Sequence, residues 1–101
     1  MKIVKNPRAA IMAVALAITG CAAIPAQEMS DARQALRAAE EVGAATKAAR
    51  DFDEARVLLE DANRFLNEGR YELARIVALR AKRLAIDARQ SSLGDKAPPT
   101  P

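Results

Sequence analysis

The sequence lacks the side chains on which most enzyme chemistry depends. Its 101 residues include no histidine, no tryptophan and one cysteine, and aromatic residues make up only 3%. Without histidine, no side chain has an ordinary pKa near neutrality at which to act as a general acid or base. The four glycines form no loop of the kind that binds phosphate groups. These absences favour a protein that is not an enzyme and needs no cofactor.

The acidic residues do not compensate for these absences. Their closest pairs in the chain are sequence neighbours, namely Glu40-Glu41, Asp53-Glu54 and Glu60-Asp61. Adjacent residues of a helix point about 100° apart, so these pairs cannot act on one substrate atom or hold one ion. We therefore expect no catalytic residue and no metal site.

The single cysteine comes at the end of a long uncharged stretch near the start of the chain. Three basic residues in the first eight are followed by an apolar run over 9–24, with Gly20 directly before Cys21. A basic start, an apolar run and small residues are typical of a targeting segment. The run is short for a permanent membrane span, which needs about 20 apolar residues.

The tetrapeptide Ile18-Thr19-Gly20-Cys21 resembles the lipobox of bacterial lipoproteins. The resemblance implies that a diacylglycerol is attached to the Cys21 thiol and that a signal peptidase cuts between Gly20 and Cys21. Residues 1–20 are then a signal peptide, and residues 21–29 form a lipidated tether. The alternatives are an uncleaved or simply secreted segment, a chance match, or a structural thiol at Cys21.

Removal of the signal would change the charge of the protein. The formal net charge of +3 includes three basic residues before position 9, so thirteen Lys and Arg then face thirteen Asp and Glu. A neutral chain lacks the basic excess that displaces counterions from nucleic acid, so we expect no nucleic-acid partner. A single cysteine also excludes an intramolecular disulfide.

The residue after the cysteine bears on localisation. Ala22 is not the aspartate that retains lipoproteins in the inner membrane, so the resemblance favours the outer membrane, with the domain facing the periplasm.

The first helix is predicted over about 30–48. Ser30 is a good N-cap, and Asp31 in the first turn suits the helix dipole. Apolar residues then recur at helical spacing, at Ala32, Ala35, Leu36, Ala39 and Val42. Gly43 interrupts this stripe at a cost of about 1 kcal/mol, so whether the helix breaks there stays open. Pro25 disfavours helix across the preceding tether.

A second helix is predicted over about 51–67. Asp51 can cap it, and Glu54 three residues later can complete a capping box. The residues of its apolar arc are Phe52, Ala55, Leu58, Leu59, Ala62, Phe65 and Leu66. On the opposite side, the spacing predicts ion pairs of Glu60 with Arg56 and Arg64.

A third helix is predicted over about 70–91, after Gly69 ends the second one. Its broad apolar face contains Tyr71, Leu73, Ala74, Val77, Ala78, Ala81, Leu84, Ala85 and Ala88. A second apolar patch on the opposite side contains Ile76, Leu79 and Ile86, which are candidate partner contacts. This helix is basic and the second is acidic, so the two could complement each other. The proline-rich residues 92–101 are predicted to be a disordered tail.

The segment Gly69-Arg70-Tyr71-Glu72-Leu73-Ala74 resembles the turn and second helix of a tetratricopeptide unit. In this interpretation glycine turns the chain, the aromatic ring of Tyr71 plugs the hairpin and Ala74 lets the helices approach. Only one such hairpin is present, and repeat arrays need about three units.

A wider resemblance covers about 30–90. The Ala-Arg-Gln-Ala-Leu-Arg-Ala-Ala-Glu stretch at 32–40, Gly43-Ala44-Ala45, Phe52-x-x-Ala55 and Glu68-Gly69-x-Tyr71 resemble the bacterial envelope family called domain of unknown function 4398. The lipobox agrees with that resemblance. Relatives often have Ala-Pro where this chain has Arg50-Asp51, and some continue into an OmpA-like peptidoglycan-binding domain. The family offers no catalytic residues to transfer.

The sequence thus predicts an all-α protein, a small antiparallel bundle of two or three helices over 30–91 with a tetratricopeptide-like hairpin, after a cleaved signal peptide. Alanine favours helix but buries little apolar surface, so a lone bundle is expected to be marginally stable. We expect a membrane contact through Cys21 and an envelope protein or a second copy as partner. The alternative is a structural tether from the outer membrane to peptidoglycan or to an envelope complex.

Overall fold

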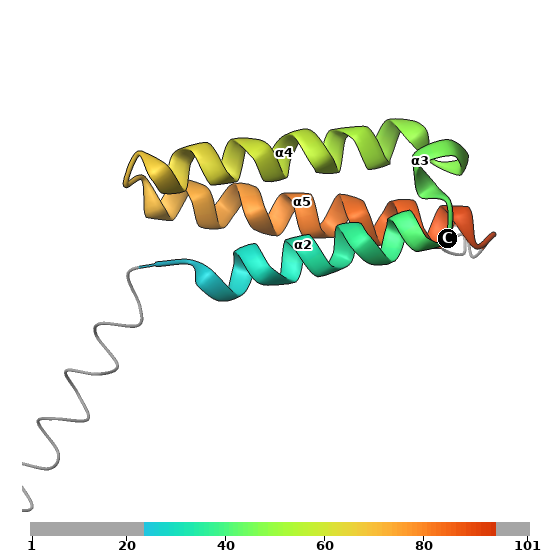
Figure 1. Cartoon of the computed structure of the whole chain (residues 1–101), viewed down its shortest axis with the longest axis horizontal. Helices are drawn as coiled ribbons and strands as arrows, with labels where there is room; N and C mark the ends of the chain where they lie inside the picture. The colour runs from blue at the N-terminus through green and yellow to red at the C-terminus, as the bar shows by residue number, and fades with distance from the viewer. Residues whose placement is uncertain (1–23, 95–101) are drawn as a thin grey trace, which may run out of the picture.

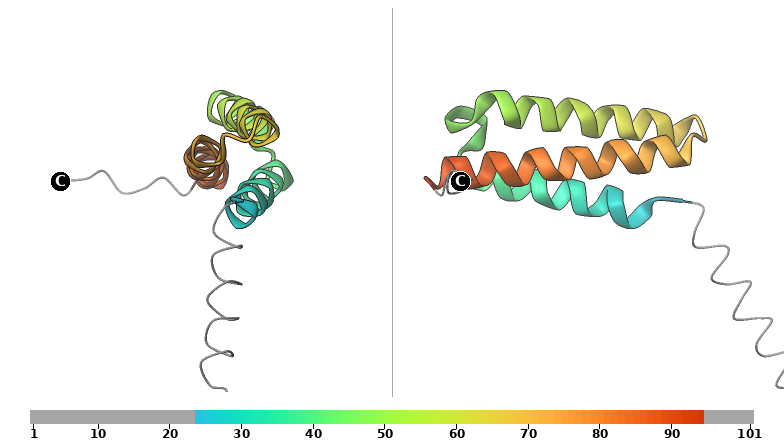
Figure 2. Two further views of the ribbon diagram at one scale, coloured as in Figure 1. Left: turned by 90° about the vertical axis from the view of Figure 1, so that its left-hand side faces the viewer. Right: turned by 180° about the vertical axis from the view of Figure 1, so that it is seen from behind.

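The described part of the computed structural model, residues 24–94, is a bundle of three long helices and one short one. The long helices are α2 (Ala26–Glu41), α4 (Ala49–Asn67) and α5 (Tyr71–Ser92), and a single turn, α3 (Ala44–Lys47), lies between α2 and α4. Seen near end-on, the three long helices form a triangle (Figure 2). No strand occurs among these residues, and the predicted all-α bundle is confirmed.

Consecutive long helices run in opposite directions (Figure 1). α4 is antiparallel to α2 and α5, so α2 and α5 are parallel. The tight turn between α4 and α5 therefore lies at the same end of the bundle as the start of α2. The short helix α3 and the end of α5 lie together at the opposite end.

The three long helices share one spacing of buried residues. Alternating steps of three and four residues keep side chains on one stripe of a helix, as in coiled coils. The stripe on α2 contains Met29, Ala32, Leu36 and Ala39. The stripe on α4 contains Phe52, Ala55, Leu59, Ala62 and Leu66. The stripe on α5 is all alanine, at Ala74, Ala78, Ala81, Ala85 and Ala88, and we call it the alanine seam.

The alanine seam explains how so few large side chains form a core. Four of its five alanines are completely buried, and the fifth, Ala81, is 2% exposed. Alanine lets helix axes approach toward the short end of the usual range of about 8–10 Å, so backbone atoms supply part of the packing. Both α2 and α4 pack against this face of α5. The broad apolar face predicted for the third helix is confirmed, apart from Tyr71.

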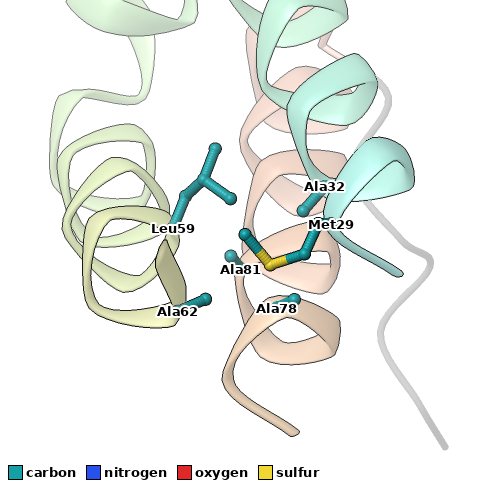
Figure 3. Packing of buried hydrophobic residues seen from close by; sticks show 6 residues of the cluster. All are labelled: Met29, Ala32, Leu59, Ala62, Ala78 and Ala81. Atoms are coloured by element: carbon teal, nitrogen blue, oxygen red, sulfur yellow. The ribbon is translucent and has the colours of Figure 1, made fainter. Parts of the chain in front are cut away.

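Met29 fills the space that the small side chains leave. Figure 3 shows it extending from α2 between Leu59 of α4 and the alanines Ala78 and Ala81 of α5. It is 2% exposed and is the largest fully buried side chain of the described residues. The flexible thioether of methionine suits such irregular gaps. The prediction that Met29 belongs to the tether, outside the helical domain, is therefore wrong.

The start of the first helix was predicted wrongly. The helix begins at Ala26 with Pro25 at the N-cap, and Ser30 lies inside it without capping it. Proline is tolerated at a helix start because the first amides have no partner within the helix. The Pro25 carbonyl accepts a hydrogen bond from the Met29 amide at 3.1 Å, so the helical turn includes residues that were assigned to the tether.

The open question at Gly43 is resolved by a break in the helix. Gly43 has φ +81, and its own amide donates to the Glu40 carbonyl at 3.0 Å, which closes α2. Its carbonyl accepts from the amide of Lys47 at 2.9 Å, which opens α3. The helix predicted over about 30–48 is therefore divided into α2 and the single turn of α3. The left-handed conformation that glycine adopts without strain allows this change of direction.

The predicted capping box of the second helix is also absent. α4 begins at Ala49 after the N-cap Ala48, and no side chain caps it. Asp51 lies in the first turn instead, where its charge still suits the helix dipole. The end at Asn67 agrees with the prediction.

Gly69 ends α4 as predicted, in a Schellman motif. With φ +78, its amide donates to the Leu66 carbonyl at 3.0 Å, and the Arg70 amide donates to the Phe65 carbonyl at 2.9 Å. α5 follows at Tyr71 and extends to Ser92, so the first residue assigned to the tail is helical. The rest of the predicted tail from position 95 lies outside the described residues.

Tyr71 does not plug the hairpin as the tetratricopeptide resemblance implies. It is 38% exposed. The aromatic ring near the turn is instead that of Phe65, which lies under two guanidinium groups, with Arg64 at 5.0 Å and Arg70 at 5.2 Å from its centroid. Such cation–π contacts stabilise by about 0.5–1 kcal/mol at exposed sites. The turn is thus covered by arginine rather than by tyrosine.

Candidate interaction surface

The outward face of α5 carries the predicted candidate contacts. Ile76, Leu79 and Ile86 are 48%, 44% and 39% exposed, so neither α2 nor α4 covers them. They lie on the side of the helix opposite the alanine seam, which brings α2 and α4 to the other face. The predicted second apolar side of this helix is therefore exposed among the described residues.

These aliphatic residues belong to a longer stripe with coiled-coil spacing. Alternating steps of four and three residues connect Glu72, Ile76, Leu79, Arg83, Ile86 and Gln90, which we call the outer seam. An open groove of about 420 Å³ lies along it, lined by Leu79, Lys82, Arg83, Ile86, Asp87 and Gln90. α5 therefore has two seams of the same period, one inside the bundle and one outside.

Charged residues flank the outer seam. α5 contains five Lys and Arg residues against Glu72 and Asp87. Arg75, Lys82 and Arg89 recur every seven residues along one side of the seam. Arg75 pairs with Glu72 within α5, and the Lys82 ammonium lies 3.7 Å from the Asp31 carboxylate of α2. α5 thus keeps an excess of three positive charges, five against two, although two of its basic side chains have acidic partners.

The predicted charge complementarity between α4 and α5 is not observed. Within residues 24–94 no ion pair joins these two helices, and the one between long helices is Lys82–Asp31. On α4, Arg56 pairs with Glu60 at 2.9 Å as predicted. Arg64 pairs with Asp61 at 3.0 Å instead of with Glu60. The charges of α4 thus act along their own helix and do not compensate the basic residues of α5.

A polar contact that the sequence did not indicate joins α2 to α4. The Arg33 guanidinium donates a hydrogen bond to the Asn63 side-chain oxygen at 3.1 Å. These residues are thirty apart in the chain, so no local spacing rule could pair them.

The described residues offer no other arrangement that indicates chemistry. No group of three or more carboxylate, histidine or cysteine side chains in this range could hold a metal ion. Among the same residues, none of the helices combines the length and apolar character needed to cross a membrane. The predicted modification site at Cys21 and the cleavage position after Gly20 lie outside the described residues.

The protein is a small all-α domain, in which the hairpin of α4 and α5 packs against α2 and the short helix α3 connects α2 to α4. A model of the family described as Domain of unknown function (DUF4398) matches residues 27–97, which is most of the chain. The chain belongs to this family, as the resemblance of its alanine-rich segments had indicated. No curated protein and no solved structure was found to match it.

Proposed function

We propose that the chain is a lipid-anchored protein of the bacterial cell envelope that acts as a non-catalytic helical interaction module. Its anchor would be the lipidated Cys21, and the domain would face the periplasm from the outer membrane. The contact role is supported by one observation above all, the exposure of Ile76, Leu79 and Ile86 on the outward face of α5. Large apolar side chains gathered on one exposed face are typical of protein contact sites.

The position of the anchor agrees with such a role. Ala26, the first residue of α2, is only five residues after Cys21, so the two are at most about 18 Å apart. The start of α2 and the turn at Gly69 occupy the same end of the bundle, so this end would lie near the membrane (Figure 1). α5 begins there and is about 33 Å long, which would leave its outer seam accessible.

Mass spectrometry of the protein purified from bacterial membranes tests the anchor. The expected product begins at Cys21 and carries a diacylglycerol on its thiol. Replacement Cys21→Ala should give an unlipidated chain that partitions with soluble proteins. An unmodified Cys21, or an N-terminus at another residue, would contradict the lipoprotein part of the proposal.

Site-specific crosslinking in cells tests the contact role. A photoreactive residue at position 79 should give crosslinks to an envelope protein, whereas one at position 57 should not. Val57 is a matched control because it is exposed to the same extent, 44%, on the outward side of α4. Equal crosslinking from both positions would mean that the outer face of α5 has no special role.

A structural tether to peptidoglycan or to an envelope complex is the second candidate function. It is favoured by the elongated bundle, in which the anchor end and the α3 end lie far apart (Figure 1). A tether should sediment with purified peptidoglycan sacculi after detergent extraction, whereas an interaction module should stay in the supernatant with its protein partner. The two results separate the candidates.

A further inference from the structure

The outer seam of α5 has the pattern of a helix-binding surface. Its six residues follow each other in alternating steps of four and three, which places them on one stripe along the helix. The alanine seam has the same period and packs against helices along its whole length. The outer seam differs in that its aliphatic side chains are large and exposed, and in that Arg83 lies between two of them, Leu79 and Ile86.

We propose that the outer seam binds one α-helix of a partner protein, and that the contact face of this helix carries aliphatic residues flanked by acidic ones. A carboxylate of the partner would lie opposite Arg83. This proposal deepens the proposed function and rests on it, because it names the kind of partner that the interaction module takes.

Charge complementarity identifies the acidic character of the partner. Arg75, Lys82 and Arg89 form a basic row beside the seam, at the positions from which coiled-coil helices contact flanking residues of a partner. Glutamate and aspartate at the facing positions of a partner would pair with this row. Such flanking charges determine which helices associate more than how tightly they do so.

A second copy of the chain fits this face poorly. In an antiparallel pair of α5 helices, Ile76 would face Ile86 of the other copy, but Lys82 would then face Lys82 and Arg75 would face Arg89. In a parallel pair, Arg83 would face Arg83. Both arrangements place like charges across the contact, which disfavours association.

A membrane surface also fits poorly. Helices that lie in the interface bury a continuous apolar face, commonly with tryptophan, phenylalanine and leucine. Arg83 interrupts the outer seam between Leu79 and Ile86. In a contact with a helix, the same guanidinium can form a bidentate pair with a carboxylate. Arg83 would therefore favour a partner helix that carries a carboxylate at the facing position.

Two designed peptides test the proposal on the full chain, purified in neutral detergent. Both are amphipathic helices about four heptads long with leucine and isoleucine along the seam. One has glutamate at the flanking positions and at one central seam position, and the other has lysine at all of these. Fluorescence anisotropy should show saturable one-to-one binding of the acidic peptide. The basic peptide should bind at least about tenfold more weakly, equivalent to about 1.4 kcal/mol.

Three variants locate the binding. Leu79→Glu with Ile86→Glu should abolish binding of the acidic peptide, whereas Val57→Glu on α4 should leave it unchanged. Arg83→Glu should reverse the preference between the two peptides. Circular dichroism of each variant checks that the helices remain, which is expected because all these side chains are exposed.

Several results would overturn the proposal. Equal affinity for both peptides, or loss of binding in Val57→Glu, would remove the charge argument or the location. A dimer in sedimentation equilibrium that Leu79→Glu dissociates would make a second copy the occupant. Binding to phosphatidylglycerol vesicles that requires Leu79 and Ile86 would make it the membrane. If position 79 crosslinks in cells while the peptides do not bind, the helix-binding proposal fails but the interaction module stands. An unlipidated Cys21 contradicts only the anchor.

Discussion

The two faces of α5 have the same residue spacing, but one is buried and the other is exposed. The inner face contains the alanine seam, whose members are buried, and the outer face contains Ile76, Leu79 and Ile86, which are exposed. A ranking by side-chain hydrophobicity alone would bury the aliphatic residues and expose the alanines. The comparison shows that burial here follows how closely helices can approach, and not the apolar area of each side chain.

Neighbouring residues make this contrast sharp. Ala78 is completely buried and Leu79 is 44% exposed, although they are adjacent. Successive residues of a helix point about 100° apart, so one turns to the core and the other to solvent. Substitutions at such pairs compare the two faces with the local helix context held nearly constant.

The largest difference between the two faces is expected when the same charge is placed on each of them. Ala78→Glu places a carboxylate where Met29 and Leu59 pack, and an uncompensated buried charge destabilises by about 3–5 kcal/mol. Leu79→Glu should change the free energy of unfolding by no more than about 0.5 kcal/mol. Urea denaturation followed by circular dichroism measures both.

The pH dependence gives a further check on that pair. Burial raises the pKa of a carboxyl group, so the destabilisation by Ala78→Glu should shrink as the pH falls toward 4 and the group becomes protonated. Leu79→Glu should show no such recovery. Equal destabilisation by the two variants at neutral pH would show that the inner and outer faces are not distinct.

Removal of the Met29 side chain should have the next largest effect. Met29→Ala leaves a space among the alanines of α5, which have no atoms with which to fill it (Figure 3). Truncation of a buried methionine to alanine costs about 2–5 kcal/mol. Val57→Ala, which shortens an exposed side chain, should cost no more than about 0.5 kcal/mol. A small effect of Met29→Ala in chemical denaturation would mean that α2 packs loosely.

Enlarging the inner face tests whether close approach matters. Ala85 is completely buried and Ile86 is 39% exposed. Ala85→Leu would force α5 away from its neighbours, and overpacking typically costs about 1–3 kcal/mol. Ile86→Leu conserves volume on the exposed face and should be nearly neutral. If thermal unfolding shows that Ala85→Leu stabilises the protein, the alanine seam is underpacked.

The smallest effect concerns the ion pair at the boundary between the faces. Lys82 and Asp31 join α5 to α2 with both side chains about one third exposed, and such pairs contribute about 0–1 kcal/mol. Lys82→Ala should therefore destabilise only slightly, and less at high salt, because exposed charges are screened. A salt-independent loss above that range would indicate a packing role of the lysine stem.

The helices themselves were largely predictable from the sequence. Periodicity located the second and third helices to within two residues at each end, and the glycine at 69 was assigned correctly because its left-handed conformation has a local cause. The inner and outer faces of α5 were also separated correctly, including Ile76, Leu79 and Ile86. These features depend on spacing within one segment, which the sequence contains.

The helix starts were not predictable in the same way. Ser30 and Asp51 have good capping side chains, yet α2 and α4 begin earlier, after Pro25 and Ala48. Capping contributes about 1 kcal/mol, and the burial of Met29 by an extra turn of α2 outweighs it. A backward extension of the three-and-four spacing from Ala32 would have identified Met29.

The charge contacts divide in a similar manner. Arg56–Glu60 follows from spacing along α4, whereas Lys82–Asp31 and Arg33–Asn63 depend on which helices become neighbours. The exposure of Tyr71 likewise contradicts a role inferred from resemblance alone, because Phe65 and two arginines already cover the turn. Contacts between helices therefore had to come from the fold.

By itself, the sequence determined the helical class, the turn at Gly69, the two-sided pattern of α5 and the family to which the chain belongs. Only the tertiary structure decided that Gly43 breaks the first helix, that Met29 belongs to the core and that neither α2 nor α4 covers the outer seam. The physical reason is the range of the forces involved. Helix periodicity is local, whereas burial depends on the approach of segments far apart in the chain, which here is set by the smallness of alanine.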